Sequence, residues 1–347
     1  MPERSKLLLF TDTYAHQVNG AKVTLEELTH NCPENIEIVI VSTDDFSSIP
    51  FPTYAEIRFA MVTPRKISSI IKKEKPDMIH IVTEGTIGFA AARACRKLKI
   101  PYTTAFHTKF PEYIALRIPF IQEKIVHKAL HYIHGGASHI LVSSPVMQVY
   151  LEDNSYPKDK IAVIPFGVDH TIFSPGERTL FHNLPKPILL FVGRVSIEKN
   201  IGDFIAIETE GTKIVVGDGP LRESLKEQFS EVQFLGYKSK TELRDIYCSS
   251  DVFVFPSLTD TLGLVNIEAL SCGLPVLGYD IGGLSSIITN GLDGVLIPYG
   301  KSLTSGLSQV LKIPREQCIE TSKKYNWKDY TRFFLSLQIF IPRDTWI

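Results

Sequence analysis

Short, mostly apolar runs recur along the chain and are separated by stretches of helix length. They cover residues 7–10, 36–41, 78–82, 102–106, 140–142, 188–192, 213–216, 232–235, 252–255 and 275–279. Most are continuously apolar rather than alternating, which is typical of strands buried on both faces of a parallel sheet. The repeated order of strand and helix therefore predicts an α/β protein with doubly wound parallel sheets.

The number of predicted strands is too high for one modest sheet, and 347 residues suffice for two domains at about 150 residues each. A stretch rich in Pro and Gly runs from Pro165 to Pro187 and is typical of a linker. We therefore expect one domain over residues 1–168 and another over residues 186–325. Ligands of open α/β sheets bind beyond the carboxyl ends of the strands, so the chemistry is expected in a cleft between the two domains.

Composition narrows the class of protein. The chain is 44% apolar and 22% charged, which is ordinary for a folded soluble protein. No apolar run approaches the roughly 18 residues of a membrane-spanning helix, and the run Leu7–Phe10 is too short for the core of a signal peptide. The five cysteines are scattered without a Cys-x-x-Cys pair, which indicates neither a disulfide framework nor a zinc site. We expect a cytoplasmic protein.

The formal net charge of −1 is unevenly spread along the chain. Residues 58–128 carry 14 Lys and Arg against 5 Asp and Glu, and the remainder carries 23 against 33. This asymmetry favours an anionic surface or ligand on one side of the molecule. The alternative is that separate helices happen to be basic.

Residues 255–270 combine a strand, a glycine-containing loop and a helix. The start of such a helix offers backbone N–H groups and a positive dipole end, which suit a phosphate. Asp260 lies in the loop and Glu268 in the helix, where carboxylates can accept bonds from ribose or sugar hydroxyls. The alternative is that Asp260 only caps the helix and Glu268 is a solvated helix residue.

A second loop follows the predicted strand 188–192. Arg194 and Lys199 in this loop can both reach one diphosphate, the arginine through its fork and the lysine as a point charge. The alternative is a pair of exposed surface cations. A third loop, Gly217-Asp218-Gly219-Pro220, resembles the start of a dinucleotide fingerprint, but Arg222 occupies the place of its third glycine, which argues against a nicotinamide dehydrogenase.

The first half of the chain has polar residues at predicted strand ends. Asn19-Gly20 before a predicted helix lets backbone amides approach a ligand closely. His107 follows the strand 102–106 and can orient a ligand or relay a proton, although a lone histidine is more often structural. His127, His131 and His134 share a helical face, which we interpret as helix surface because no acidic or Cys ligand accompanies them.

The motifs DTYAHQVNG, HIVTEGTIGFAA, AFHTKFPEY, PFGVDHTIFSP, FVGRVSIEKN, GDGP and TDTLGLVNIEALSCGLPV occur in this order along nearly the whole chain. In this set and order the chain resembles glycosyltransferase family 4. The resemblance implies that the chain is a retaining, nucleotide-sugar-dependent enzyme with the GT-B architecture, in which two Rossmann-like domains face each other across a cleft. It also implies that the last helix, within residues 326–347, crosses back to the N-terminal domain.

The resemblance implies roles for individual residues. Arg194 and Lys199 match the cations that hold the donor diphosphate, and Glu268 matches the acid that holds the ribose. Asp260 matches the acid that contacts the donor sugar, where most members have Glu. The implied catalytic set is His107, Arg194, Lys199 and Asp260, and the implied donor-binding set is Asn19, Gly20, Gly193, Gly217, Tyr237, Leu262, Gly263, Leu264 and Glu268.

The Thr-Asp-Thr pattern around Asp260 resembles a branch with lipid-directed mannosyl and glucosyl transferases. We therefore expect transfer of a hexose from a UDP- or GDP-sugar to a membrane lipid, with no cofactor and no nucleic acid partner. The basic, aromatic segment Lys109–Lys124 suits contact with an anionic membrane at the cytoplasmic face. No Asp-x-Asp triplet occurs, so we expect no metal. The alternatives are a GT-B sugar-nucleotide epimerase and a non-catalytic sugar- or lipid-binding protein on the same scaffold.

Overall fold

The computed structural model describes residues 4–13, 20–51, 54–107 and 123–346. The chain divides into two compact units, of which unit 1 comprises Met1–Pro165 with Trp327–Ile347 and unit 2 comprises Phe166–Asn326. The sequence predicts domain boundaries near residues 168, 186 and 326. In the structure unit 2 already begins at Phe166, so nearly all of the Pro- and Gly-rich stretch lies within unit 2 rather than between the units.

Unit 1 is built on a six-stranded parallel sheet in the order β2-β1-β5-β6-β7-β8. The strands are β1 (Ser5–Phe10), β2 (Ile36–Val41), β5 (Met78–Ile81), β6 (Thr103–Phe106), β7 (Ile140–Val142) and β8 (Ile161–Val163). The helices are α1 (Gly20–Asn31), α2 (Pro64–Glu74), α3 (Thr86–Leu98), α5 (Glu123–His134), α6 (Pro145–Asp153) and α14 (Trp327–Ser336). An antiparallel hairpin, β3 (Ser48–Phe51) and β4 (Tyr54–Ala60), joins β2 to α2.

The core of unit 1 follows from the continuous apolar runs of its strands. Leu7, Leu8, Leu9 and Phe10 of β1 are all fully buried, as expected for a central strand with helices on both faces. The C-terminal segment completes this unit, since the backbone N–H of Ile341 donates to Asp77 at 2.8 Å. Residues far apart in the sequence therefore share one core.

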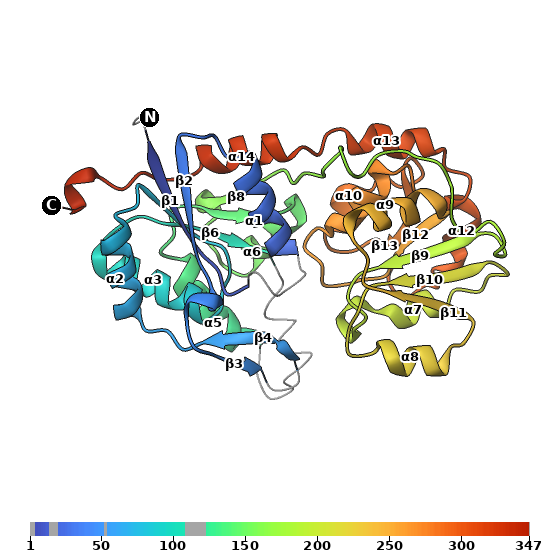
Figure 1. Cartoon of the computed structure of the whole chain (residues 1–347), viewed down its shortest axis with the longest axis horizontal. Coiled ribbons are helices and arrows are strands. Elements are labelled where there is room, and N and C mark those ends of the chain that lie inside the picture. Colours follow the sequence, from blue (N-terminus) through green and yellow to red (C-terminus); the bar gives the residue numbers. More distant parts are fainter. Residues whose placement is uncertain (1–3, 14–19, 52–53, 108–122, 347) are drawn as a thin grey trace. The chain divides into compact units, whose positions relative to one another are not determined.

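Unit 2 has a second six-stranded parallel sheet, in the order β11-β10-β9-β12-β13-β14 (Figure 1). Its strands are β9 (Ile188–Val192), β10 (Thr212–Val216), β11 (Val232–Gly236), β12 (Val252–Phe255), β13 (Val276–Tyr279) and β14 (Gly294–Ile297). Its helices are α7 (Ile201–Ile205), α8 (Arg222–Gln228), α9 (Lys240–Ser249), α10 (Leu264–Ser271), α11 (Leu284–Ile287), α12 (Thr304–Val310) and α13 (Arg315–Ser322). Short 3₁₀ helices occur in unit 2 at Ile197–Lys199 and in unit 1 at Thr43–Asp45, Lys158–Lys160 and Arg343–Trp346.

The strand order of unit 2 reverses between β9 and β12. The chain winds outward from β9 through β10 to β11, and then crosses to β12 and winds the other way, with α7 and α8 on one side of the sheet and α9 and α10 on the other (Figure 1). The predicted class, α/β with doubly wound parallel sheets, is confirmed in both units. The point of reversal is where such sheets leave room for a ligand.

The expectation that three histidines of α5 lie on the helix surface is wrong for His134. Its side chain is fully buried, with Nδ1 2.9 Å from the Thr104 hydroxyl and Nε2 3.6 Å from the Glu84 carboxylate. The ring of His131 stacks on Tyr156 at a centroid distance of 4.0 Å. The helical face that carries these histidines is packed against the rest of unit 1, which a helical spacing alone does not reveal.

The N-terminus of α3 is capped by a side chain from the loop that follows β1. The Asp12 carboxylate, after β1, accepts from the backbone N–H groups of Ile87 at 2.7 Å and Gly88 at 3.2 Å. The hydroxyl of Thr83 also donates to it at 3.0 Å. Asp12 therefore ties the end of β1 to α3.

Replacing Asp12 with alanine is expected to lower the free energy of unfolding by about 1–2 kcal/mol, because two helix N–H groups lose their acceptor. The measurement is urea unfolding of the wild-type and variant chains. The matched control is Glu34→Ala, at an exposed loop position. Equal unfolding midpoints for Asp12→Ala and Glu34→Ala would contradict the capping role.

Candidate active site

The loops that follow β9 and β12 lie at the carboxyl edge of the unit 2 sheet. These two strands pair directly and in parallel, so their carboxyl ends point to the same edge. The first loop carries Arg194 and Lys199, and the second carries Asp260 and leads into α10. The reversal of strand order between β9 and β12 therefore brings two predicted cations and a predicted carboxylate to one place.

Lys199 and Asp260 form a two-pronged ion pair across the point of reversal. The Lys199 Nζ lies 2.6 Å from Oδ1 and 2.8 Å from Oδ2 of Asp260. The two side chains are 25% and 21% exposed, so each is partly open to solvent. The lysine ammonium is therefore held in position by a carboxylate and can be approached from outside.

Arg194 is held by a carboxylate on its own loop. Its Nε lies 3.9 Å from Oε1 of Glu198, whose side chain is 8% exposed. The backbone carbonyl of Glu198 accepts from the hydroxyls of Ser257 and Thr259, both at 3.4 Å. These bonds join the loop after β9 to the loop after β12. Arg194 and Lys199 therefore lie on one loop, and that loop is hydrogen-bonded to the loop after β12.

Glu268 is a half-buried carboxyl on α10 and not the solvated helix residue that the sequence left open. The hydroxyl of Tyr247, on α9, donates to its Oε2 at 3.2 Å. Burial raises the pKa of Glu268 from 4.5 to about 7, and the Tyr247 hydroxyl and then the charge of Lys240 oppose this shift. Near neutral pH the carboxyl can therefore both donate and accept hydrogen bonds, which suits a diol.

The start of α10 requires a glycine. Gly263 precedes the helix with φ of 83°, a left-handed conformation that favours glycine. A Cβ there would lie 2.7 Å from the ring of Phe255 and 2.5 Å from the Asn266 amide nitrogen. Leu262 on one side is buried, and Leu264 on the other begins the helix. The predicted Leu262-Gly263-Leu264 turn therefore presents backbone at the edge of the sheet.

Gly193 and Gly217 serve close packing of two neighbouring loops. A Cβ on Gly217 would lie 2.0 Å from the backbone oxygen of Gly193, and a Cβ on Gly219 would lie 2.3 Å from that of Val195. Gly217 also has φ of 126°. The Gly-Asp-Gly sequence is thus needed to let the loop after β10 rest on the loop after β9.

Tyr237 follows β11 with its side chain 61% exposed. Its backbone N–H donates to the Asp218 carboxylate at 3.1 Å, and Arg222 pairs with the other oxygen of Asp218, also at 3.1 Å. Asp218 and Arg222 therefore link the ends of β10 and β11. The N–H of Tyr237 is therefore already engaged by this carboxylate.

Two of the predicted residues of unit 1, Gly20 and His107, lie within the part of the chain that the structure describes. Gly20 is the first residue of α1, whereas Asn19 lies outside the described residues, as does most of the segment Lys109–Lys124. His107 follows β6 and is half-buried. Burial lowers the pKa of His107 from 6.5 to about 4, so its imidazole is neutral at physiological pH.

Three residues of the site escaped the sequence analysis: Glu198, Asp218 and Tyr247. Glu198 stands four residues after Arg194, a spacing at which opposite charges pair on a helical turn and which could have indicated the contact. Asp218 lay inside a recognised motif. Tyr247 is 21 residues from Glu268 and its contact has no local signal. Within the part of the chain that the structure describes, no group of three or more His, Cys, Asp or Glu side chains is placed to hold a metal ion.

Two family models match adjacent parts of the chain. Residues 17–172 match the model described as Glycosyltransferase Family 4, and residues 177–325 match the model described as Glycosyl transferases group 1. The matched ranges together include the candidate site residues of both units.

Three curated relatives are named as transferases or synthases. A sulfoquinovosyl transferase of Arabidopsis thaliana is 31% identical over 84% of this chain, which spans only 62% of that protein. An alpha-monoglucosyldiacylglycerol synthase of Streptococcus pneumoniae is 28% identical over 86% of this chain and 76% of its own length. A GDP-mannose-dependent alpha-mannosyltransferase of Mycobacterium tuberculosis is 27% identical over 72% of this chain and 68% of its own length.

Solved structures share the fold at low identity. Anabaena HepE in complex with UDP and glucose is 16% identical, with a TM-score of 0.74 over 96% of this chain and 99% of its own. A sucrose-phosphate synthase from Thermosynechococcus elongatus is 18% identical, with a TM-score of 0.78 over 96% of this chain and 98% of its own. These likenesses establish a common fold.

The raised pKa of Glu268 predicts a pH-dependent stability. The folded state favours the protonated carboxyl, so this residue's contribution is greatest below pH 4.5 and is lost as pH rises toward 7. Glu268→Gln removes the titration. We expect the free energy of unfolding of the variant, relative to wild type, to rise by about 1–3 kcal/mol between pH 5 and pH 8. Urea unfolding of both chains at the two pH values measures this difference.

The control for this experiment is Glu223→Gln on α8, an exposed carboxylate of the same unit. It should leave the stability difference between the two pH values unchanged. A Glu268→Gln chain whose stability follows the wild-type curve at both pH values would contradict a protonated Glu268 in the folded protein.

Proposed function

Because the chain belongs to the family 4 glycosyltransferases and shares their GT-B fold of two Rossmann-like units, we propose that it transfers a hexose with retention of configuration. The donor is a UDP- or GDP-linked glucose or mannose and the acceptor is a membrane lipid. The observation that carries the proposal is the contact of Lys199 with Asp260 at the point where the strand order of unit 2 reverses.

The departure of a nucleoside diphosphate leaves negative charge on phosphate oxygens. Arg194 and Lys199 provide fixed positive charge for it, and the start of α10 adds backbone N–H groups. Each cation is paired with a carboxylate before the donor arrives, Arg194 with Glu198 and Lys199 with Asp260. The diphosphate competes for the ammonium of Lys199 and so frees Asp260 to accept from hydroxyls of the donor sugar. In this proposal fixed cations take the place of a divalent metal.

The nucleoside lies along the same edge of the unit 2 sheet. Glu268 binds the two ribose hydroxyls, with the Tyr247 hydroxyl holding the carboxyl in place. The carbonyl of Tyr237 meets the base beyond β11. A pKa of about 7 makes the charge of Glu268 sensitive to pH near neutrality, so in this proposal donor affinity depends on its protonation.

Retention follows from attack on the face that the diphosphate leaves, with the departing phosphate accepting the proton of the acceptor hydroxyl. The neutral imidazole of His107 orients the sugar through a hydrogen bond rather than a charge. Gly20 at the start of α1 offers its backbone to the diphosphate from unit 1.

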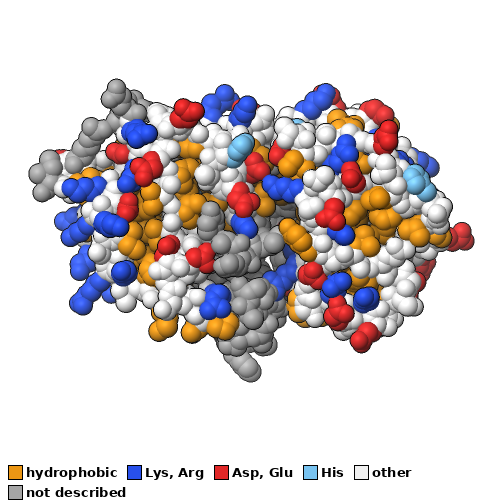
Figure 2. Space-filling model, viewed as in Figure 1, with side chains coloured by type: hydrophobic (Ala, Val, Ile, Leu, Met, Phe, Trp, Pro, Cys, Tyr) orange, Lys and Arg blue, Asp and Glu red, His pale blue; other side chains and the backbone are white. Residues whose placement is uncertain are grey.

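The lipid acceptor is supported by relatives and by charge. The pneumococcal relative is named an alpha-monoglucosyldiacylglycerol synthase, a name that contains a diacylglycerol lipid. Exposed cations of α2 and α3, with the residues that follow them, form a basic face on unit 1 (Figure 2). The basic face comprises Arg65, Lys66, Lys72, Lys73, Lys75, Arg93, Lys97 and Lys99.

This basic face gives unit 1 a side that suits an anionic membrane surface, at about 1 kcal/mol for each Lys or Arg near the lipid. In the part of the chain that the structure describes, none of the helices is long and apolar enough to cross a bilayer. We propose peripheral attachment at the cytoplasmic face through this basic face.

Lys199→Ala is expected to lower turnover of the nucleotide-sugar donor by roughly 10- to 150-fold, because one charged partner of the diphosphate is lost. The measurement is release of nucleoside diphosphate from UDP- and GDP-sugars. The matched control is Lys226→Ala on α8, an exposed lysine away from the two loops. If a folded Lys199→Ala chain turns over the donor as fast as the wild type does, Lys199 does not bind the donor diphosphate.

Charge reversal on the basic face is expected to weaken membrane binding. Lys72→Glu combined with Lys73→Glu should lower binding to phosphatidylglycerol vesicles at low salt by about tenfold or more, and phosphatidylcholine vesicles should bind neither chain. Vesicle flotation measures this. Lys226→Glu combined with Lys301→Glu, two exposed positions on unit 2, is the control for net charge. Equal flotation with anionic and neutral vesicles would rule out the electrostatic attachment.

A further inference from the structure

A second charged hollow lies in unit 2, at the opposite edge of the sheet from the candidate active site. Several of its lining residues directly precede strands: Lys186 and Pro187 stand before β9, Asp251 before β12 and Pro275 before β13. The candidate site lies after the same strands, and each strand of four or five residues spans about 13–17 Å. The hollow and the candidate active site are therefore separated by the length of the strands.

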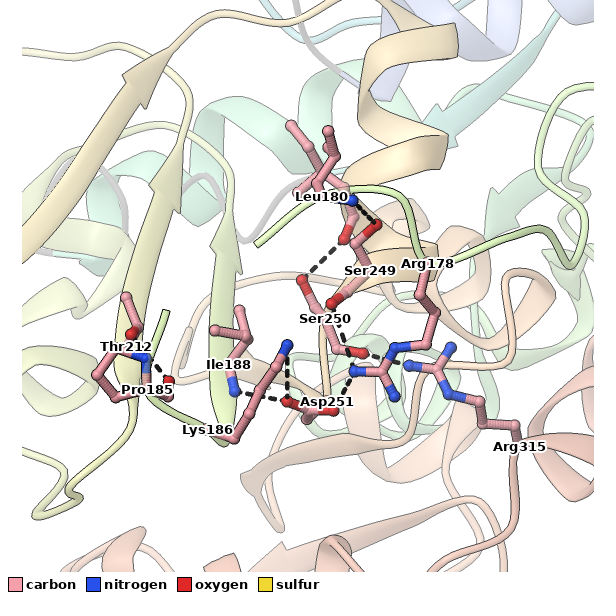
Figure 3. Close-up of polar contacts among 11 residues, drawn as sticks. Arg178, Leu180, Pro185, Lys186, Ile188, Thr212, Ser249, Ser250, Asp251 and Arg315 are labelled. Atoms are coloured by element: carbon pink, nitrogen blue, oxygen red, sulfur yellow. Dashed lines mark hydrogen bonds and ion pairs between the residues drawn. The ribbon is translucent and has the colours of Figure 1, made fainter. Parts of the chain in front are cut away.

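Three cations converge on this hollow and only one carboxylate accompanies them. Arg178, Lys186 and Arg315 line it together with Asp251 (Figure 3). The cations come from the stretch between Phe166 and β9 and from the first residue of α13. The charged lining residues thus carry a net charge of two positive units.

Asp251 is already engaged by the protein. It accepts from the backbone N–H of Ile188 at 2.7 Å and pairs with the Arg178 guanidinium, while the Lys186 Nζ lies 3.9 Å away (Figure 3). Its side chain is 17% exposed. One mostly buried carboxylate shared in this way offsets one positive charge of the three.

The arginines keep donors for a ligand. Arg178 contacts Ser249 and Asp251 through Nη2, and Arg315 contacts the backbone carbonyl of Ser250 also through Nη2. A guanidinium has five N–H groups in a fork that matches phosphate oxygens. Burial, and then the charge of Arg178, lower the pKa of Arg315, as expected for cations brought close together. An anion between them would relieve this repulsion.

The hollow has room for more than a single ion. Its volume is about 450 Å³, within the range of small-molecule sites, and Leu311 and Ile313 supply apolar lining beside the cations. We propose that this cationic hollow, Arg178, Lys186 and Arg315 around Asp251, binds a phosphate group carried by a small molecule or by a lipid head. This ligand is separate from the sugar donor, and the inference does not rest on the proposed transferase activity.

Another account of the cluster is that it only fastens the stretch before β9 to the sheet. Arg178, with the bond from the Leu180 N–H to the Ser249 hydroxyl at 3.1 Å, performs that fastening. Lys186 does not need to, since its side chain is 46% exposed and lies beyond hydrogen-bond distance of Asp251. Lys186 is therefore the position at which binding and fastening can be separated.

The test is calorimetric titration of inorganic pyrophosphate into the full chain that carries Arg194→Ala and Lys199→Ala, so that diphosphate binding at the candidate active site is removed. We expect Lys186→Gln in this background to weaken pyrophosphate binding by roughly 5- to 20-fold. Lys186→Arg should retain it. Lys301→Gln, an exposed lysine after β14, is the control for net charge.

A second arm uses phosphatidylglycerol vesicles with the same Lys186→Gln and Lys301→Gln chains, both also carrying Lys72→Glu and Lys73→Glu so that binding through the basic face of unit 1 is weakened. Loss of pyrophosphate binding in Lys186→Gln alone identifies a soluble phosphate as the ligand source. Loss of vesicle binding in Lys186→Gln alone, with no pyrophosphate bound, identifies a lipid head. If Lys186→Gln and Lys301→Gln behave alike in both arms, the cationic hollow is not a phosphate site.

Discussion

The reversal of strand order between β9 and β12 is the constraint on which the candidate site depends. Because the two strands are parallel neighbours, the loops after them leave the sheet at the same edge. Lys199 and Asp260 stand 61 residues apart in the chain and meet there at 2.6 Å. The bonds from Ser257 and Thr259 to the carbonyl of Glu198 then tie the two loops together. A sheet wound in one direction only would separate these residues by several strands.

Both sites on unit 2 rest on cations held near carboxylates, but the charge balance differs. At the carboxyl edge each cation has one acid, Arg194 with Glu198 and Lys199 with Asp260. In the proposed function, a donor diphosphate competes with Asp260 for Lys199, so that binding of phosphate releases the carboxylate proposed to bind the sugar. At the amino edge three cations share Asp251, so an anion adds to an unbalanced cluster. The two proposed anion sites of this sheet therefore differ in charge balance, one at each end of its strands.

Buried polar groups account for most differences between the sequence-based expectations and the structure. A helical face of three histidines gave no sign that His134 is enclosed by Thr104 and Glu84. Glu268 had two interpretations, and its half-buried position and the bond from Tyr247 exclude the solvated one. The strands β8, β14, β3 and β4 were not predicted: β8 has three residues, β14 carries a Gly and β3 a Pro, while β4 carries Glu and Arg within its apolar run. Local pattern does not report what a distant element covers.

The sequence by itself determined the class of fold, because continuous apolar runs separated by helix-length segments leave parallel, doubly buried strands as the consistent solution. It also located the loops after strands, and with them Arg194, Lys199 and Asp260, and the helix that carries Glu268, since polar residues at and just beyond strand ends need no tertiary knowledge to find. The tertiary structure alone decided which of these side chains meet and that burial raises the pKa of Glu268. Those properties depend on burial and on partners such as Tyr247, which the chain brings close only when the sheet is assembled.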